Sequence, residues 1–328
     1  MKIFFYGGCH AQVFARVFRE WGSADVCDVV VNYELIASNL PFPYERLHNY
    51  DAVVFSPINN KDEYNTKYIE DYCNKHGIKS ISYPWMQWNG YHPFTEKREF
   101  LGLNHWFPVG HDLEPDQARI EIVKSAEITT DRLKQHEETN RTNLKISDFI
   151  LKYYRDTRLF LTPDHPSNVL YRYAVWEISK RLSIDVSHDF YRYEQLLQPE
   201  IILPIQPAVS AALDLRFEAS DEYRFDAAGG TFKMYGPEYA KFGQHLNSDA
   251  LRVFSRSKIE VIDYKTTESD DFRPQNDPAV GSSLIGRVVS DEGSNLVVEF
   301  LAAKDGIIPD PTIQTIKDSE WKVSSRVG

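Results

Sequence analysis

The chain of 328 residues contains only three cysteines, Cys9, Cys27 and Cys73, and their spacing fits neither a disulfide framework nor a zinc site. So small and odd a set is typical of a reducing compartment, so we expect a cytoplasmic protein without a metal site. Long apolar runs are also lacking, and residues 1–20 have no signal-peptide pattern. We therefore expect no membrane span.

Positive charge is scarce as well. Lys and Arg number 37 against 48 Asp and Glu, which gives a net charge of -11. A general nucleic-acid-binding protein needs a basic surface, so this balance argues against nucleic acid as a partner. Hydrophobic content of 42% with 13% aromatic residues is typical of a globular chain and excludes a disordered one.

The first half of the chain alternates predicted strands and helices. Short apolar runs predict strands over residues 3–6, 26–31, 52–55, 80–83 and 159–162. Helical spacing predicts helices over about 61–76, 116–139 and 147–158, one beginning near Ser167, and one after the first strand. An irregular aromatic stretch is expected over about 93–115. Such alternation indicates an α/β fold, a parallel sheet with helices on both faces.

The last fifty residues follow a different pattern. Alternating runs at 283–289 and 296–300 flank the turn Asp291-Glu292-Gly293, which predicts a β-hairpin. A polar, proline-containing stretch at 267–277 precedes them and reads as a linker. We therefore expect an α/β catalytic domain over residues 1–266 and a small β appendage over 278–328.

The most informative segment is Gly7-Gly8-Cys9-His10-Ala11-Gln12, which joins the first strand to the first helix. Cys9 would stand on a glycine-rich turn at a helix N-terminus, where backbone N–H groups and the helix dipole favour a thiolate. His10 could accept the proton. The alternative is a small hydrophobic side chain packed under the helix, but such a cysteine needs no open glycine turn.

Further polar and aromatic residues follow the other predicted strands. In an open parallel sheet, ligands bind outside the carboxyl ends of the strands. Besides Cys9 and His10, the residues expected at this edge are Asn59, Asn60, Trp85, Gln87, Trp88, Asn89, Tyr91, His92, Asp164 and His165.

Each of these candidates has a second interpretation. His165 is the strongest candidate base for Cys9, but it and Asp164 could instead cap the helix that begins near Ser167. Asn59 could donate to an oxyanion or could simply belong to a turn. The aromatic residues, Trp85, Trp88 and Tyr91, could stack on a ligand or belong to the core. His136 and four other histidines have no supporting context.

Three of these segments together resemble the WcbI-type family of capsule polysaccharide biosynthesis proteins. The resemblance rests on Gly8-Cys9-His10-Ala11-Gln12, on the aromatic segment 83–94 and on Asp164-His165-Pro166-Ser167, and it spans about residues 1–185. It implies a Rossmann-like protein that binds coenzyme A and acts as an acetyltransferase on a capsule sugar.

The resemblance also implies roles for individual residues. Cys9, His10, Asp164 and His165 would be catalytic, and the coenzyme A site would include Gly7, Gly8, Gln12, Asn59, Trp85, Trp88, Tyr91 and His92. The fold is similar to SGNH-type hydrolases and acyltransferases, which have a serine where Cys9 stands. Those enzymes have an Asp three residues before the catalytic His, where this chain has Thr162. A Cys–His dyad is therefore expected rather than a full triad.

Three functions remain open from the sequence. The first is an acyltransferase that moves an acyl group from acyl-CoA to a saccharide hydroxyl in capsule or surface polysaccharide biosynthesis. The second is a thiol-dependent esterase or deacylase, with water as the acceptor. The third is a non-catalytic carbohydrate-binding protein in which the aromatic residues stack on sugar rings. The sequence does not identify the acceptor sugar, the acyl group or the oligomeric state.

Overall fold

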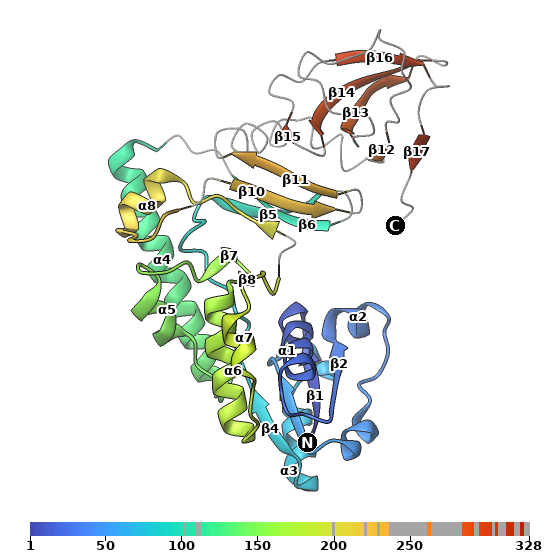
Figure 1. The fold of residues 1–328 in the computed structure, drawn as a ribbon, viewed down its shortest axis with the longest axis vertical. Coiled ribbons are helices and arrows are strands. Elements are labelled where there is room, and N and C mark those ends of the chain that lie inside the picture. Colours follow the sequence, from blue (N-terminus) through green and yellow to red (C-terminus); the bar gives the residue numbers. More distant parts are fainter. Residues whose placement is uncertain are drawn as a thin grey trace. The chain divides into compact units, whose positions relative to one another are not determined.

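The computed structural model describes residues 1–100, 103–108, 113–198, 201–219, 222–227, 230–235, 261–263, 284–291, 295–303, 306–307, 313–317 and 322–324 (Figure 1). The chain divides into two compact units. The first comprises residues 1–91, 122–198 and 213–217, and the second comprises 92–121, 199–212 and 218–328. The expected domain boundary at 266–278 lies outside the described residues and stays a prediction.

The first unit is built on a four-stranded parallel sheet, which confirms the expected Rossmann-like α/β fold. The strand order is β2-β1-β3-β4. The strands are β1 (Lys2–Gly7), β2 (Val26–Val31), β3 (Ala52–Phe55) and β4 (Lys79–Ser82). The chain moves outward from β1 in one direction to β2 and in the other to β3 and β4. The carboxyl ends of β1 and β3 therefore mark the topological switch point, where such sheets bind ligands.

Alternating side chains of β1 cover the two faces of this sheet. Phe5 contacts Phe18 of α1 (Cys9–Glu20), with ring centroids 5.8 Å apart. On the opposite face, Phe4 and Tyr6 pack in a buried cluster with Leu47 of the 3-10 helix η1 (Tyr44–Asn49) and Ile69 of α3 (Lys67–His76). Helical elements thus cover both faces, as the alternation of the sequence predicts.

Further helices complete the first unit or join it to the second. They are α2 (Asn32–Ala37), α4 (Pro115–Thr139), α5 (Ser147–Tyr153), α6 (Asn168–Leu182), α7 (His188–Arg192) and α8 (Pro207–Leu213). The expected helix over 61–76 begins only at Lys67, after the short 3-10 helix η2 (Asp62–Tyr64), and ends at Gly77 (φ 67°). The expected helix over 147–158 ends at Tyr153. No described helix has the length and apolar character that crossing a membrane requires.

The predicted fifth strand of the sheet is wrong. Residues 160–162 form β7 (Phe160–Thr162), which pairs antiparallel with β8 (His165–Pro166) across a tight turn. The outer edge of β4 is taken by the segment that precedes α5. Asn143 Oδ1 accepts from the Ser82 amide at 2.7 Å, and the Ser82 carbonyl accepts from Leu144 N at 3.0 Å. At its carboxyl end, β4 is therefore bonded on this side to residues 143–144 and not to residues 160–162.

The second unit contains several antiparallel strands. The expected irregular stretch over 93–115 is instead a hairpin of β5 (Thr95–Phe100) and β6 (Leu103–Pro108). The strands β9 (Ile201–Ile202), β10 (Glu222–Ala227) and β11 (Gly230–Tyr235) form a three-stranded sheet. The aromatic content of the 93–115 stretch hid the hairpin, because Trp106 and Phe107 break the simple apolar–polar alternation.

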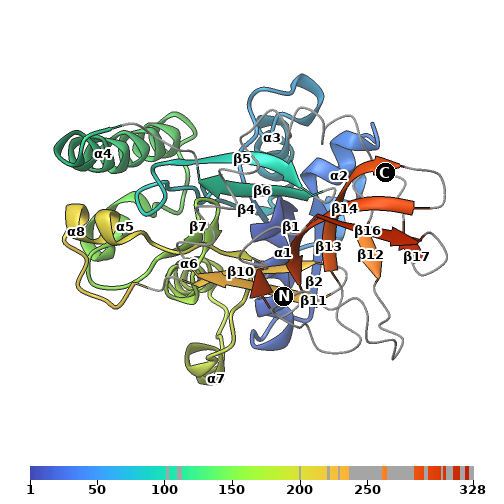
Figure 2. The same ribbon diagram turned by 90° about the horizontal axis from the view of Figure 1, so that it is seen from above.

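The C-terminal strands confirm the predicted hairpin. β13 (Leu284–Asp291) pairs antiparallel with β14 (Asn295–Ala303), and β16 (Ile313–Lys317) lies on the other side of β14 (Figures 1 and 2). β12 (Val261–Asp263), β15 (Gly306–Ile307) and β17 (Lys322–Ser324) extend the same sheet. The expected linker over 267–277 lies outside the described residues.

Candidate functional site

Cys9 is the first residue of α1 and lies directly after the carboxyl end of β1. Its side chain is half-buried, and all three cysteines of the chain are thiols. The other two thiols differ from it, because burial raises the pKa of Cys27 and of Cys73 to about 11. Cys9 is therefore the thiol placed at the switch point and at a helix N-terminus, where a thiolate is favoured.

The two glycines before Cys9 let the aromatic side chains of Tyr83 and Trp85 pack directly against the turn. A Cβ atom on Gly7 would lie 2.5 Å from the hydroxyl oxygen of Tyr83, and one on Gly8 would lie 2.7 Å from Cζ3 of Trp85. Any larger residue at either position would push these rings away. The glycine-rich turn is thus required by the close approach of the segment that follows β4.

Residues after the other strands also surround this turn. The Asn32 Oδ1 atom, after β2, lies 3.8 Å from the Cβ position of Gly8, and Ser56, after β3, lies 3.4 Å from that of Gly7. Burial, with a smaller effect from Cys9, raises the pKa of Tyr83 well above its usual value. The Tyr83 hydroxyl has no hydrogen-bond partner in the described part of the chain. The carboxyl ends of all four strands thus converge near Cys9.

His10 is fully buried at the same turn. Its Nε2 atom donates to the main-chain carbonyl of Asp164 at 2.9 Å, and its ring packs on Trp85 with centroids 4.4 Å apart. Burial lowers the pKa of this imidazole to about 4, although the bond to Asp164 opposes the shift. The neutral ring therefore carries its proton on Nε2. Its Nδ1 lone pair has no partner among the described residues.

The turn between β7 and β8 holds Asp164 and His165 in place. Thr162 Oγ1 donates to the Asp164 carboxylate at 2.9 Å and accepts from the His165 amide at 3.0 Å. Asp164 is buried, and the charge of His165 contributes to the lowered pKa of His10. The structure therefore brings Asp164 and His165 to His10. Thr162 thus binds both the Asp164 carboxylate and the His165 amide, and the alternative that these two residues cap the helix near Ser167 stays a prediction.

Other candidates lie elsewhere. Trp88 and Tyr91 are each 1% exposed and pack edge to face, and the Trp88 indole donates to Thr130 Oγ1 at 2.9 Å. This burial favours the interpretation that both residues belong to the core. Gln12 is exposed on α1. Asn59 is exposed and donates to Asn140.

His92 is buried in the second unit, where its carbonyl accepts from Thr95 Oγ1 at 2.8 Å. A ligand role for it, as for Gln12, Asn59, Trp88 and Tyr91, stays a prediction.

Sequence reasoning missed three residues beside the turn. The sequence places Tyr83 at the end of a strand and in the aromatic segment 83–94, and Ser56 in a turn, but it indicates neither as a site residue. Asn32 directly follows the second strand, so the rule that ligands bind at the carboxyl ends of strands would have found it.

Comparison with known proteins supports the fold but gives no family. No family model matches the chain, and no curated protein matches it. One solved structure is similar: WcbI, described as a novel polysaccharide biosynthesis enzyme, in its native form without a disulfide bond between coenzyme A and a cysteine. The two chains share 18% identity with a TM-score of 0.51, over 68% of this chain and 82% of that one. At this identity the likeness shows a common α/β fold.

Proposed function

We propose that this chain is an acyltransferase that moves an acyl group, acetyl in the simplest case, from acyl-CoA to a saccharide hydroxyl in capsule or surface polysaccharide biosynthesis. The observation that carries the proposal is the half-buried Cys9 thiol at the switch point, next to a buried, neutral His10. The similar structure is described as a polysaccharide biosynthesis enzyme and its description mentions coenzyme A and a cysteine, which supports the same class.

In the first half of the reaction, the Cys9 sulfur would attack the carbonyl carbon of the thioester. The new S–C bond makes an acylated Cys9, and the bond to the coenzyme A sulfur breaks as that sulfur takes a proton. Backbone N–H groups in the first turn of α1 would stabilise the oxyanion or hold a phosphate of the substrate.

In the second half, a saccharide hydroxyl would attack the acyl carbon. A histidine takes the hydroxyl proton, and the Cys9 thiol is released with the ester formed. His165, which is partly exposed, is one candidate base, and His10, whose Nδ1 atom has no hydrogen-bond partner among the described residues, is the other. Alternatively, Cys9 lines the thioester site and the hydroxyl attacks the thioester directly, with the same base.

Asp164 would act through His10. Its carbonyl oxygen accepts from Nε2 and so keeps the proton on that atom. Gly7, Gly8 and Trp85 would shape the site, because the glycines let the Trp85 ring reach the turn. These are the residues for which the geometry supports the expected coenzyme A site.

A thiol-dependent esterase is the second candidate, since the partial exposure of Cys9 would also admit water as the acceptor. The carbohydrate-binding alternative is weaker. Trp88 and Tyr91 are buried in the core, so Trp85 alone of the three expected aromatic residues is partly exposed and could stack on a sugar ring.

Release of the coenzyme A thiol from acetyl-CoA, followed with a thiol reagent, tests the proposal. Thiol release that requires an added saccharide supports transfer, and release at the same rate without saccharide assigns an esterase. No release in either case, while the protein is folded, would overturn both.

A further inference from the structure

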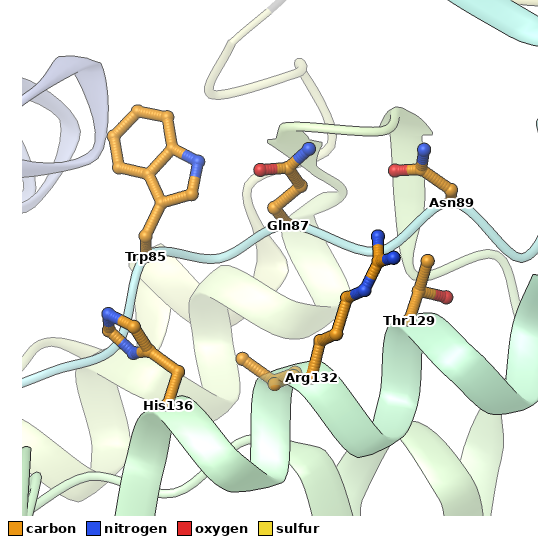
Figure 3. Close-up of a pocket in the computed structure, with 7 residues that line it drawn as sticks. Trp85, Gln87, Asn89, Thr129, Arg132 and His136 are labelled. Atoms are coloured by element: carbon orange, nitrogen blue, oxygen red, sulfur yellow. The ribbon is translucent and has the colours of Figure 1, made fainter. Parts of the chain in front are cut away.

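A pocket of about 230 Å³ lies between the segment after β4 and the helix α4 (Figure 3). Trp85, Gln87 and Asn89 line it from the segment, and Thr129, Arg132 and His136 line it from the helix. Figure 3 shows Arg132 extending from the helix between Gln87 and Asn89. The volume is below the range typical of drug-sized ligands, so it suits a single small ring.

Three polar groups of this pocket lack a partner within the described ranges. Arg132 is exposed and forms no ion pair there. The Asn89 Oδ1 atom and the His136 Nδ1 atom are buried without a hydrogen bond. Burial also lowers the pKa of His136, so this ring is neutral near pH 7. Buried polar atoms without partners are uncommon, and here two residues that line the same pocket each carry one.

The chemistry of the lining matches a sugar that carries a negative charge. An indole offers an apolar face to the C–H groups of a pyranose, and amides such as Gln87 and Asn89 bond to its hydroxyls. A guanidinium binds a carboxylate through two parallel hydrogen bonds. Arg132 supplies this group, and no carboxylate is among the described residues that line the pocket.

The pocket also borders the Cys9 turn. Trp85 belongs to its wall, and the same ring packs on His10 and approaches Gly8. A sugar held against Trp85 would therefore lie one side chain away from the reacting groups. The pocket and the Cys9 turn thus share the Trp85 side chain as a common wall.

We propose that the pocket between Trp85 and Arg132 binds an acidic sugar unit of the acceptor, with its carboxylate on Arg132. The role as acceptor rests on the proposed acyl transfer, whereas the binding does not. The pocket then selects acidic over neutral saccharides.

The test compares methyl β-D-glucuronide with methyl β-D-glucoside, which differ in the carboxylate, by titration followed with ligand-observed NMR. We expect the glucuronide to bind about 10-fold more tightly, the size of effect that a charge-assisted hydrogen bond gives. Arg132→Gln should abolish that preference. Lys134→Gln is the matched control, since it removes a positive charge from the same helix outside the pocket.

Equal affinity for the two glycosides in the wild type, or a preference that survives in Arg132→Gln, would overturn the proposal. Coenzyme A is titrated in parallel, because its phosphates could also bind Arg132. An approximately 10-fold loss of coenzyme A affinity in Arg132→Gln would assign the pocket to that substrate and likewise overturn the acceptor site. Binding of glucuronide without binding of coenzyme A would instead remove the proposed acyl transfer and leave the sugar pocket standing.

Discussion

The Nε2 atom of His10 donates a hydrogen bond to the main-chain carbonyl oxygen of Asp164, 2.9 Å away, across 154 residues of sequence. This bond ties the first turn of α1 to the turn between β7 and β8. A carbonyl oxygen only accepts, so the bond fixes the proton on Nε2 and leaves the Nδ1 lone pair available. The bond therefore fixes the orientation and the tautomer of His10, as the proposed role of a base requires.

Alkylation should distinguish Cys9 from the other cysteines. With iodoacetamide at pH 7, we expect Cys9 to react first, because it is half-buried at a helix N-terminus. Cys27 and Cys73 are buried, with the pKa of each raised to about 11. Mass spectrometry of tryptic peptides measures the order, and Cys9→Ser provides the control. Equal labelling of the three residues in the folded protein would contradict a reactive Cys9.

Substitutions of Cys9 and of the histidines should not have independent effects. Cys9→Ser, His10→Gln and His165→Ala should each lower turnover by about 10²-fold or more, the size of general acid–base catalysis. Because residues that act as a unit lose activity non-additively, Cys9→Ser combined with either histidine variant should be scarcely worse than the worse single variant. Multiplicative losses in steady-state kcat/KM would mean that the cysteine and the histidine act separately. A histidine variant with full turnover would exclude that residue as the base.

Thr162 should act as a positioning residue. Thr162→Val removes the hydroxyl that bonds to Asp164 and to the His165 amide, and should cost about 1–3 kcal/mol of unfolding free energy. It should also lower kcat more than it changes KM, because the Asp164 carbonyl that holds His10 shifts. Thr162→Ser keeps the hydroxyl and should restore kcat. Equal kcat values for the two variants would exclude the positioning role.

The sheet could be predicted from the sequence because its strands are short apolar runs bounded by turns. Residues 3–6, 26–31 and 52–55 follow this pattern, and the structure places them in adjacent parallel strands. Residues 159–162 have the same pattern, but Thr162 makes the chain turn back, so β7 pairs with β8 instead. Which edge of a sheet is already covered depends on contacts such as Ser82 with Asn143, and local sequence does not encode them.

The candidate site could be predicted only in part. The position of Cys9 follows from the strand, the glycines and the helix, since all are local. The choice between Trp85 and Trp88 does not, because it depends on which ring meets the Thr130 hydroxyl and Tyr91 in the folded chain. For the same reason, nothing in the local sequence of α4 indicates that Arg132 and His136 line a pocket with Trp85.

Acidification should reveal the buried His10. Its pKa is about 4 in the folded chain and near 6.5 when unfolded, so below pH 6.5 the unfolded state binds a proton that the folded state does not. The contribution of the neutral His10 to the free energy of unfolding is therefore fully present above pH 6.5. As the pH falls from 6.5 toward 4, this contribution is lost, and the loss is on the order of 3 kcal/mol at most.

Urea unfolding of the wild type and of His10→Gln at pH 7 and at pH 4.5 measures this. The stability of the wild type relative to the variant should fall on acidification, because other titrating groups cancel in the difference. An unchanged difference would show that His10 is not buried as a neutral ring. If His10 is the base, kcat/KM should fall on the acid side of its pH profile only near pH 4. A fall near pH 6.5 would assign the base to another histidine.

Isothermal titration with coenzyme A tests the central claim most directly. The site at the switch point should bind one coenzyme A per chain, and Gly8→Ala should weaken the binding, because its methyl group would lie 2.7 Å from Cζ3 of Trp85. Thermal unfolding of the same variant checks that its fold is retained. One-to-one binding that Gly8→Ala impairs is the predicted result. The absence of any heat at millimolar coenzyme A, or binding that Gly8→Ala leaves unchanged, would contradict the account.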